Sequence, residues 1–276
     1  MGEPGVVTAP DDIYTHGHHE SVLRAHRWRN AENSAAYLLP HLRSGQRLLD
    51  VGCGPGTITL DLARRILPGE VVGIDREEEA LAAARVAACE QGIANVRFET
   101  GDAYRLDHAD ASFDVVHAHQ VLQHLSDPVA ALVEMRRVCR PGGYLAVRDA
   151  DYQAMTWYPP EPGLDRWLAL YRRVARSNGA EPDAGRRLRA WARAAGCRDL
   201  TISASVWCYA STDERRWWGS LWADRITRSA LANQALALGF VDRHDLDALA
   251  AAWRSWAGDE DGWFAVLHGE ILETVS

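Results

Sequence analysis

The chain has 276 residues, a hydrophobic fraction of 47% and a formal net charge of −8 at pH 7. A globular protein with a sizeable core is expected, and the negative charge disfavours a nucleic-acid partner, which needs a basic surface. No apolar run reaches the roughly 18 residues of a membrane span, and the N-terminus lacks the pattern of a signal peptide. We expect a cytoplasmic protein without a membrane partner, whose five scattered cysteines are reduced thiols.

The N-terminal stretch is polar and rich in histidine. Residues 14–20 have the sequence YTHGHHE, and a helical pattern follows from about Ser21 to Leu42. Three histidines within four residues suggest a metal site. Zinc sites, however, normally draw ligands from two separated groups, and we find no second group in the sequence. We therefore predict no metal, and the segment is either a solvated loop or part of a site.

The most informative segment is an apolar strand that ends in a glycine-rich turn. Residues 47–51 form the expected strand, and Gly52, Gly54 and Gly56 alternate in the turn before a helical pattern. Glycine permits positive φ and lets a ligand approach the backbone closely. The spacing G-x-G-x-G differs from the G-x-G-x-x-G of dinucleotide sites, and Pro55 removes a backbone donor. These features favour a nucleoside ligand without phosphates.

Residues 48–57, LLDVGCGPGT, resemble motif I of the class I S-adenosylmethionine (SAM) methyltransferases, in particular their UbiE-like small-molecule branch. The resemblance implies SAM as the cofactor and S-adenosylhomocysteine as the product. The loop residues implied to contact SAM are Gly52, Cys53, Gly54, Gly56 and Thr57. In this family the N-terminal part, here residues 1–43, folds over the cofactor and substrate. The candidates there are Tyr14 at the cofactor, His18 and His19 at the substrate, and Arg29 at the methionine carboxylate.

An acidic residue ends the second expected strand, residues 70–75. Asp75 lies where a ribose would present its two hydroxyls, and a carboxylate can accept a hydrogen bond from each. Arg76 follows it in the same loop and is a further cofactor candidate. Asp75 could also cap the next helical run, residues 77–91, so a purely structural role stays open.

The third and fourth strands complete the expected cofactor site. By the resemblance, Asp102, after the third strand at 95–100, receives the adenine amino group, and Ala103 offers its backbone amide to the adenine ring. Strand C-terminal ends face the ligand crevice of open α/β sheets. The fourth strand, 113–118, therefore places four further residues at the sulfonium end of SAM: His117, Ala118, His119 and Gln120.

Strands and helices alternate up to residue 150, which predicts a parallel sheet with helices on both faces. The resemblance implies an α/β Rossmann-like fold whose seven-stranded, mostly parallel sheet has the order 3-2-1-4-5-7-6. We expect a SAM-binding core over residues 44–150, within a single domain of residues 1–276. The C-terminal part, 151–276, is expected to open on an aromatic, proline-broken loop (151–165), to contribute strands at 200–209 and 262–274, and to form a helical lid at about 152–180 and 210–258. A further helix is expected over about 182–195.

Methyl transfer from a sulfonium is an in-line displacement, so alignment and exclusion of water supply much of the catalysis. A general base is needed only when the acceptor must lose a proton, and histidine is the usual one. The candidates are His119 and His18, whereas His124 is expected to be structural. Asp149, at the end of the fifth strand, either orients the substrate or caps a loop.

Eleven tryptophans are many for this length. Those in or beside the expected lid are Trp157, Trp207, Trp217, Trp218 and Trp222. Such side chains hold a planar, partly apolar substrate, although most must pack the lid on the sheet. All of them except Trp217 are substrate candidates, and we expect two or three to line the pocket. The predicted acceptor is an aromatic or polycyclic small molecule, for example an indole or a quinone-like ring.

Two other functions stay open. An RNA or protein methyltransferase would need the arginine-rich segment 166–198 beside the pocket, although solvated helix faces explain these arginines as well. A SAM-binding protein without catalysis, or one that uses the cofactor for another reaction, is the third possibility. The preferred prediction is a small-molecule methyltransferase that is a monomer or a homodimer.

Overall fold

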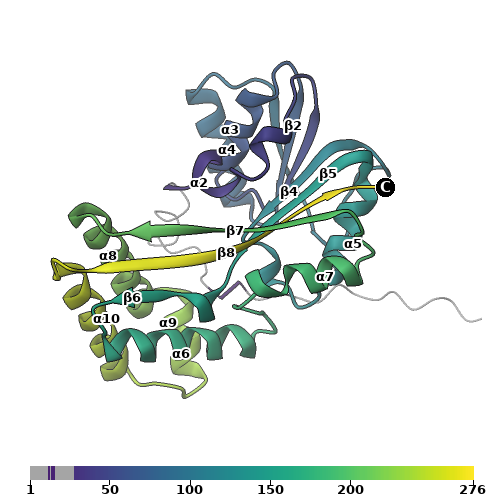
Figure 1. Ribbon diagram of the computed structural model, residues 1–276. Helices are drawn as coiled ribbons and strands as arrows, with labels where there is room; N and C mark the ends of the chain where they lie inside the picture. Colours follow the sequence, from purple (N-terminus) through teal and green to yellow (C-terminus); the bar gives the residue numbers. More distant parts are fainter. Residues whose placement is uncertain (1–11, 13, 16–27) are drawn as a thin grey trace, which may run out of the picture.

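The computed structural model describes Asp12, Tyr14, Thr15 and residues 28–276. Within these residues, a mixed sheet of eight strands has the order β3-β2-β1-β4-β5-β8-β6, and β7 pairs with β8 as well (Figure 1). If the short strand β6 is set aside, β8 lies between β5 and β7. The predicted order 3-2-1-4-5-7-6 is therefore confirmed, with the last two strands each numbered one higher.

The first half of the sheet is parallel and buried on both faces. Its strands are β1 (Arg47–Val51), β2 (Glu70–Asp75), β3 (Val96–Thr100) and β4 (Phe113–His119). The helices that alternate with them are α3 (Thr57–Arg65), α4 (Glu78–Glu90) and, after β4, α5 (Pro128–Val138). Apolar runs such as Val71–Ile74 are fully covered, which explains why they show no alternation with polar residues. All the parallel strands point their carboxyl ends to one edge of the sheet.

The second half consists of long antiparallel strands and a group of helices. β5 (Cys139–Ala150) and β7 (Leu200–Tyr209) both pair with β8 (Trp263–Thr274), and these strands reach from the first half to the helices (Figure 1). Those helices are α6 (Pro162–Ser177), α8 (Thr212–Arg228), α9 (Ala230–Ala237) and α10 (Arg243–Gly258). They occupy the sequence range in which the lid is expected.

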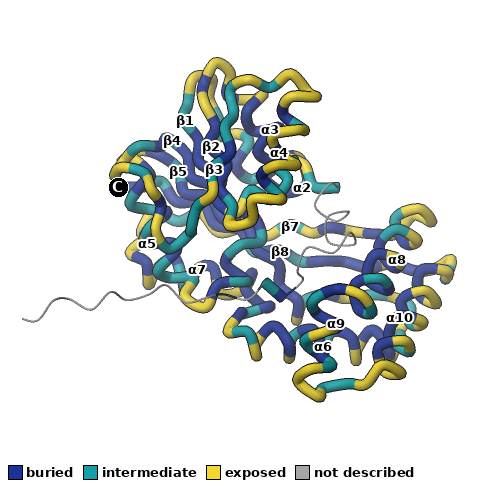
Figure 2. Tube along the Cα trace, turned by 180° about the vertical axis from the view of Figure 1, so that it is seen from behind, coloured by how far each residue is buried: buried dark blue, intermediate teal, exposed yellow. Residues whose placement is uncertain are grey.

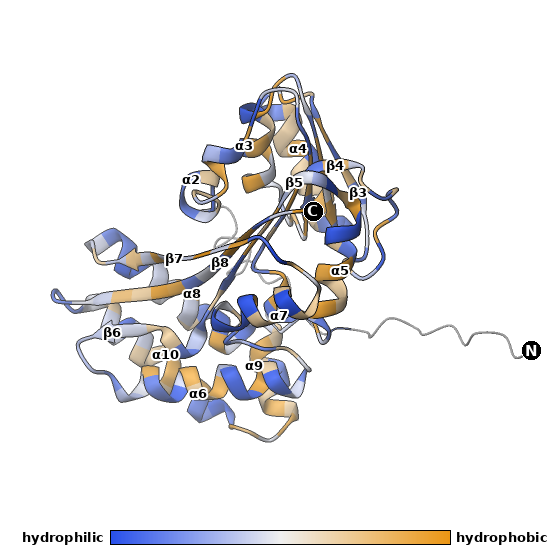
Figure 3. Cartoon of the chain, turned by 45° about the vertical axis from the view of Figure 1, so that its right-hand side comes forward, coloured by the Kyte–Doolittle hydropathy of each residue, from blue (hydrophilic) through white to orange (hydrophobic). Residues whose placement is uncertain are grey.

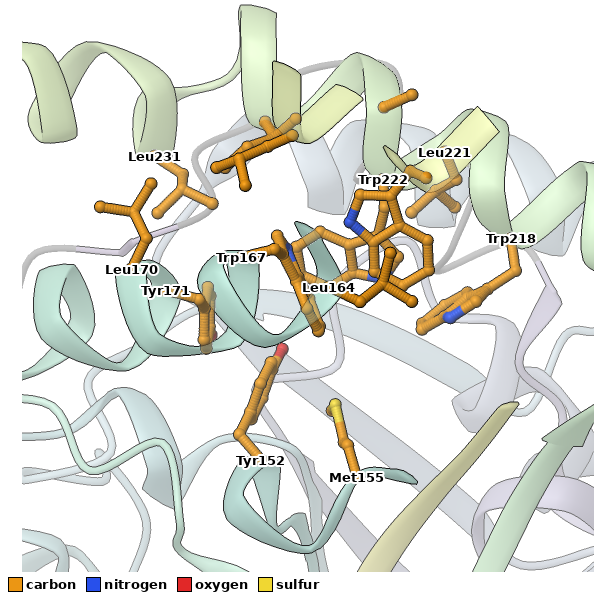
Figure 4. Packing of buried hydrophobic residues seen from close by; sticks show 14 of the residues in the cluster. Tyr152, Met155, Leu164, Trp167, Leu170, Tyr171, Trp218, Leu221, Trp222 and Leu231 are labelled. Carbon is orange, nitrogen blue, oxygen red and sulfur yellow. The ribbon is translucent and has the colours of Figure 1, made fainter. Parts of the chain in front are cut away.

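Aromatic packing holds these helices to the sheet. In α6 the buried residues include Leu164, Trp167, Tyr171 and Val174, at spacings of three and four, so one stripe of the helix faces inward. Figure 4 shows Trp167 and Tyr171 of α6 beside Trp222 of α8. Figure 3 shows the polar remainder of α6 in blue, and Figure 2 shows that exposed residues run along β7. The group is therefore built around a core of its own, separate from the core behind the parallel strands.

Three local predictions need correction. The helix expected over 21–42 does not continue beyond Trp28. The Asn30 side chain instead caps a short helix, α2 (Ala31–Ser34), and a separate turn follows at Leu39–His41. The loop expected at 151–165 contains the strand β6 (Thr156–Tyr158), which pairs with β8.

The helix expected over 182–195 is shorter than predicted. It begins as a turn at Gly185–Arg187 and becomes α7 (Leu188–Ala194). Gly185 packs on the backbone of β8, where a Cβ would lie 2.8 Å from the Gly269 nitrogen, so this part of the chain follows the sheet instead of a helix axis. Within the described part of the chain, no helix is both long and apolar enough to cross a membrane.

Candidate active site

A cavity of ≈ 400 Å³ lies at the carboxyl ends of the parallel strands and continues toward the aromatic helices. Its wall includes most of the predicted cofactor residues: Tyr14, Arg29, Gly52, Cys53, Gly54, Thr57, Asp75, Arg76, Asp102, Ala103 and His119. Segments that are distant in the sequence thus meet at one site. Five of the predicted site residues lie outside the wall: Gly56, His117, Ala118, Asp149 and Trp157. His18 and His19 lie outside the described residues.

The glycine turn shapes the floor of this cavity. Gly52 has φ +69°, and a Cβ there would collide with the Val121 side chain, so only glycine lets the two segments approach. Gly56 has φ +78°, and its Cβ would lie 2.9 Å from Ala84 and from the Phe98 ring. Gly56 therefore serves the packing of the turn against α4 and β3, and it lies outside the cavity wall.

Asp75 ties the turn to the end of β2. Its Oδ2 accepts a hydrogen bond from the Gly54 amide at 2.8 Å, and its Oδ1 accepts one from the Glu77 amide at 3.1 Å. Burial raises the pKa of this carboxyl above its usual value. The carboxylate thus holds the residue that precedes α4 and also borders the cavity, and each oxygen keeps a further lone pair for a ligand hydroxyl.

The adenine side of the predicted site is closed by a set of hydrogen bonds. The Tyr104 amide donates to Asp102 Oδ1 at 2.9 Å, and the Tyr104 hydroxyl donates to Asp12 Oδ2 at 2.6 Å. The Ser126 amide donates to the other oxygen of Asp12 at 3.0 Å. An N-terminal residue thus joins the loops after β3 and β4, and Asp12 and Tyr104, which the sequence did not single out, form part of the wall.

His117 belongs to the core and not to the cavity wall. It is fully buried, and its Nδ1 lies 2.7 Å from Asp50 Oδ1, while Thr59 donates to the other oxygen of Asp50 at 2.6 Å. Asp50 borders the cavity, whereas His117 lies two residues before the end of β4, with its side chain against Asp50 and outside the wall. Ala118 points to the opposite face of β4 and packs in the hydrophobic core. The expected contacts of His117 and Ala118 with SAM are corrected accordingly.

His119 reaches the cavity wall but is 5% exposed. Arg148 Nη1 lies 3.5 Å from its Nδ1, and its ring is stacked on His268 with centroids 6.0 Å apart. Burial, with a further effect of Arg148, holds the pKa of His119 well below 6.5. The imidazole is therefore neutral at physiological pH and a weak base.

Arg29 is fixed by a chain of polar side chains. Its Nη2 donates to Gln120 Oε1 at 2.6 Å, and Gln120 Nε2 lies 2.8 Å from Nε2 of His268. Gln120 has φ +54°, unusual for a residue with a side chain, so the backbone is held in a strained conformation where β4 ends. Buried Arg29 Nε has no hydrogen-bond partner among the described residues.

The structure changes the interpretation of two further residues, His124 and Asp149. His124, expected to be structural, lines the cavity, where its ring meets Tyr14 edge-on at 4.7 Å. Asp149 is fully buried behind the wall, and its Oδ1 accepts a hydrogen bond from the Gln123 amide at 3.2 Å. Of its two proposed roles, the structure favours the loop cap over contact with the substrate.

Tryptophans form much of the second half of the wall. Trp207, Trp218 and Trp222 border the cavity as expected, and Trp28 and Trp217 do so as well. Trp157 instead stacks on Phe264, with centroids 5.6 Å apart, outside the wall. Other wall residues that sequence analysis missed are Tyr152, Met155, Tyr209 and Arg225. They carry no motif, and only the packing of the helices brings them to the strand ends.

The described residues contain no group of three or more His, Cys, Asp or Glu side chains that could hold a metal ion. The free cysteines include Cys53 in the cavity wall, and burial raises the pKa of its thiol well above the usual value. The polar groups of the wall are thus mainly carboxylates at the strand ends, and arginine, histidine and tyrosine side chains beside the tryptophans.

Comparison with known proteins assigns the family. Residues 42–196 match the family model described as a methyltransferase domain, which covers more than half of the chain. An uncharacterized methyltransferase of Schizosaccharomyces pombe, C1B3.06c, is 38% identical over 94% of this chain and 95% of its own. A probable methyltransferase of Aspergillus luteorubrus, ltbC, is 30% identical over 96% and 98%.

More distant likenesses agree with this assignment. A demethylmenaquinone methyltransferase of Deinococcus radiodurans is 38% identical over 50% of this chain and 52% of its own. The solved structure of YcgJ from Bacillus subtilis has the same fold, with a TM-score of 0.56 and 22% identity over 92% of this chain and 97% of its own. The cyclase SpnF has a TM-score of 0.51 and 26% identity over 90% and 80%.

The chain belongs to the class I SAM-dependent methyltransferases and is homologous to their UbiE-like small-molecule members. The resemblance seen in LLDVGCGPGT is thereby confirmed, as are the fold and the enzyme class. Binding of SAM follows from the family. The residues of the cavity fit this cofactor, because a partly buried carboxylate at the end of β2 and a close glycine turn border one cavity at the carboxyl ends of the strands, where open α/β sheets bind nucleosides.

Proposed function

We propose that the protein transfers the methyl group of SAM to a planar aromatic small molecule. The observation that carries this proposal is the division of a single cavity into two chemically different halves. One half has carboxylates at the strand ends, and the other is walled by tryptophan and tyrosine side chains. A nucleoside cofactor suits the first half, and a flat, partly apolar acceptor suits the second.

We assign the cofactor contacts from the residues that line the cavity. Asp75 would accept the ribose hydroxyls, Asp102 and the Ala103 amide would bind adenine, and Arg29 would face the methionine carboxylate. SAM, when bound, supplies the activated methyl group. The chain's own contribution is to align the two molecules and to exclude water, which in well-oriented model reactions is worth about 7–11 kcal/mol.

The ion pairs of the arginine-rich segment favour a small-molecule acceptor over RNA. Arg172 and Arg176 both donate to Asp183 at 2.6 Å, and Arg186 donates to Asp151 at 2.6 Å. These guanidinium groups neutralise acidic neighbours instead of forming a free basic surface, and none of them borders the cavity. The relative from Deinococcus radiodurans is named for a quinone-type substrate, which is also a planar small molecule.

The test combines calorimetry with a methyl-transfer assay. Purified full-length protein should bind SAM and S-adenosylhomocysteine in a one-to-one ratio. It should also transfer a labelled methyl group to members of a panel of hydroxylated bicyclic aromatics, followed by mass spectrometry. Transfer only to linear aliphatic acceptors would contradict the aromatic assignment. SAM binding without transfer to any acceptor would favour a non-methyl reaction, and absence of SAM binding would refute the proposal as a whole.

A further inference from the structure

The aromatic half of the cavity carries positive charge. Arg225, from α8, lines this half, and Arg29, just before α2, lines the same cavity beside Trp207, with its guanidinium carbon 5.7 Å from the ring centre. Arg225 is 4% exposed, and its guanidinium carbon lies 4.5 Å from the centre of the Trp222 ring. The acidic residues in the described part of the wall are Asp12, Asp50, Asp75, Glu77 and Asp102. All of these belong to the N-terminal segment or to the loops of β1–β3, on the side assigned to the cofactor.

We propose that the methyl acceptor is an aromatic anion, a planar ring system that carries an ionised hydroxyl or carboxyl group, and that its charged oxygen faces Arg225. This inference deepens the proposed function and rests on it, because it names the chemical class of the acceptor. It assigns to Arg225 the recognition of the acceptor's charge and leaves Arg29 to the cofactor's carboxylate.

The groups around Arg225 favour an anion over a cation. Among the residues that the structure describes, the titratable groups that act on it or respond to it are Tyr14, Tyr152, Tyr171, Tyr209, Arg29 and His124. Burial raises the pKa of each tyrosine, that of Tyr14 to about 12, so the phenols are neutral at physiological pH. The charged members of the set are therefore both arginines.

His124 lies in the field of the same two arginines. Burial first, and then the charges of Arg29 and Arg225, lower the pKa of its imidazole to about 3. The arginine charges, unlike burial, also favour the loss of a proton from an acidic group of the acceptor. The sulfonium charge of the methyl donor acts in the same direction. An acceptor that gives its proton to bulk water before it binds needs no general base, which agrees with the neutral His119 in this wall.

Aromatic side chains in the same half of the cavity as Arg225 offer flat surfaces on which the ring of the acceptor can stack. Trp28 packs against Trp207 and Trp217 with ring centroids 5.2 Å and 5.7 Å apart. Trp218 stacks on Tyr209 at 4.4 Å, and its buried indole nitrogen has no hydrogen-bond partner among the described residues. Planar aromatic faces and a guanidinium group on one side of a cavity together fit a ring with an anionic substituent.

The experiment measures the binding of three coumarins to the full-length protein. 7-Hydroxycoumarin changes its absorption on ionisation, coumarin-3-carboxylate is an anion throughout, and 7-methoxycoumarin is the neutral analogue. The variants are Arg225→Gln and Arg225→Lys. The matched control is Arg228→Gln, which removes the same charge from an exposed position on the same helix, outside the cavity wall.

The wild-type protein should bind at least one of the two anions about ten-fold or more tightly than 7-methoxycoumarin, because a charge-assisted hydrogen bond is formed. If the phenolate is the preferred form, the apparent pKa of bound 7-hydroxycoumarin should fall by about one unit. Arg225→Gln should remove the preference for the anion but keep the affinity for the neutral analogue. Arg225→Lys should retain part of the preference, and Arg228→Gln all of it.

Equal binding of anions and 7-methoxycoumarin by the wild type would overturn the inference, as would an unchanged preference in Arg225→Gln. If Arg225→Gln loses the neutral analogue too, Arg225→Lys decides, because loss of the preference in a variant that keeps the charge is contrary to the proposal. The relative affinities of the two anions show whether hydroxyl or carboxyl is recognised. SAM binding with no preference for anions refutes this inference alone, whereas absence of SAM binding refutes the proposed function.

Discussion

Asp75 Oδ2 accepts a hydrogen bond from the Gly54 amide at 2.8 Å, so the acidic end of β2 is joined directly to the glycine turn after β1. The same carboxylate also holds the start of α4 through the Glu77 amide. One side chain thus fixes the relative positions of the two loops between which the cofactor's ribose is expected. Its removal should affect the loop and the ligand together.

Asp75→Ala should weaken SAM binding by about 2–3 kcal/mol, because two hydrogen bonds to a charged group are lost. Glu79→Ala, an exposed position on α4, removes the same charge without touching the cavity and is the matched control. Calorimetry gives both affinities, and thermal unfolding without ligand shows whether each variant is folded. A folded Asp75→Ala protein with unchanged SAM affinity would remove Asp75 from the site.

The sequence predicts the parallel half of the molecule well because its elements are local. Each strand there is a short apolar run followed by a turn and an amphipathic helix, and the ligand-facing residues stand directly after strands. The position of Asp75 follows from that rule alone, and the position of Asp102 follows from the rule together with the family motif. His117 shows the limit of this rule. The rule predicts the end of a strand to within one or two residues, and a shift of one residue decides whether a side chain faces the core or the cavity wall.

The aromatic half could not be predicted at the same level. Arg225 and Trp217 reach the cavity only because α8 packs between β7 and α10, a long-range arrangement with no local signal. Trp157 illustrates the opposite case, because an unrecognised strand, β6, pairs with β8 and turns the side chain away from the cavity. The tertiary packing of the helices, and not their amphipathic pattern, selects the residues that face the acceptor.

Trp218→Ala should lower the affinity for aromatic acceptors about ten-fold or more and leave SAM affinity within two-fold, since a stacked aromatic pair contributes roughly 0.5–1.5 kcal/mol beyond its buried area. Trp157→Ala is the control, because it removes the same side chain outside the wall. Fluorescence titration with 7-hydroxycoumarin and calorimetry with SAM measure the two affinities. Equal losses in both tryptophan variants would show that general loosening of the helices, and not contact, is responsible.

His119→Asn should reduce kcat more than SAM affinity, without changing the shape of the pH profile. The wild-type imidazole is neutral at physiological pH because burial and Arg148 hold its pKa well below 6.5. Turnover between about pH 6 and pH 8.5 should therefore show no inflection that belongs to His119. An inflection near pH 6.5 that disappears in His119→Asn would instead identify a general base.

Asp149 makes the stability of the fold depend on pH. Burial raises the pKa of its carboxyl from 3.8 to about 8, so the folded protein keeps a proton that the unfolded chain releases. Stability is then fully present below about pH 4 and falls as the pH rises toward 8, by roughly 1.4 kcal/mol per pH unit. Asp149→Asn, which preserves the oxygen that accepts from the Gln123 amide, should lose this dependence.

Denaturant unfolding at several pH values between about 5 and 8 measures this effect. The free energy of unfolding of Asp149→Asn relative to the wild type should increase with pH over this window, because the wild type alone must retain a proton against a rising pH. Asp247→Asn, at an exposed position on α10, should show a constant difference and controls for the change in net charge. A difference for Asp149→Asn that is the same at every pH would mean that the carboxyl is ionised in the folded protein, and Asp149 would then be a charged cap of the loop after β4.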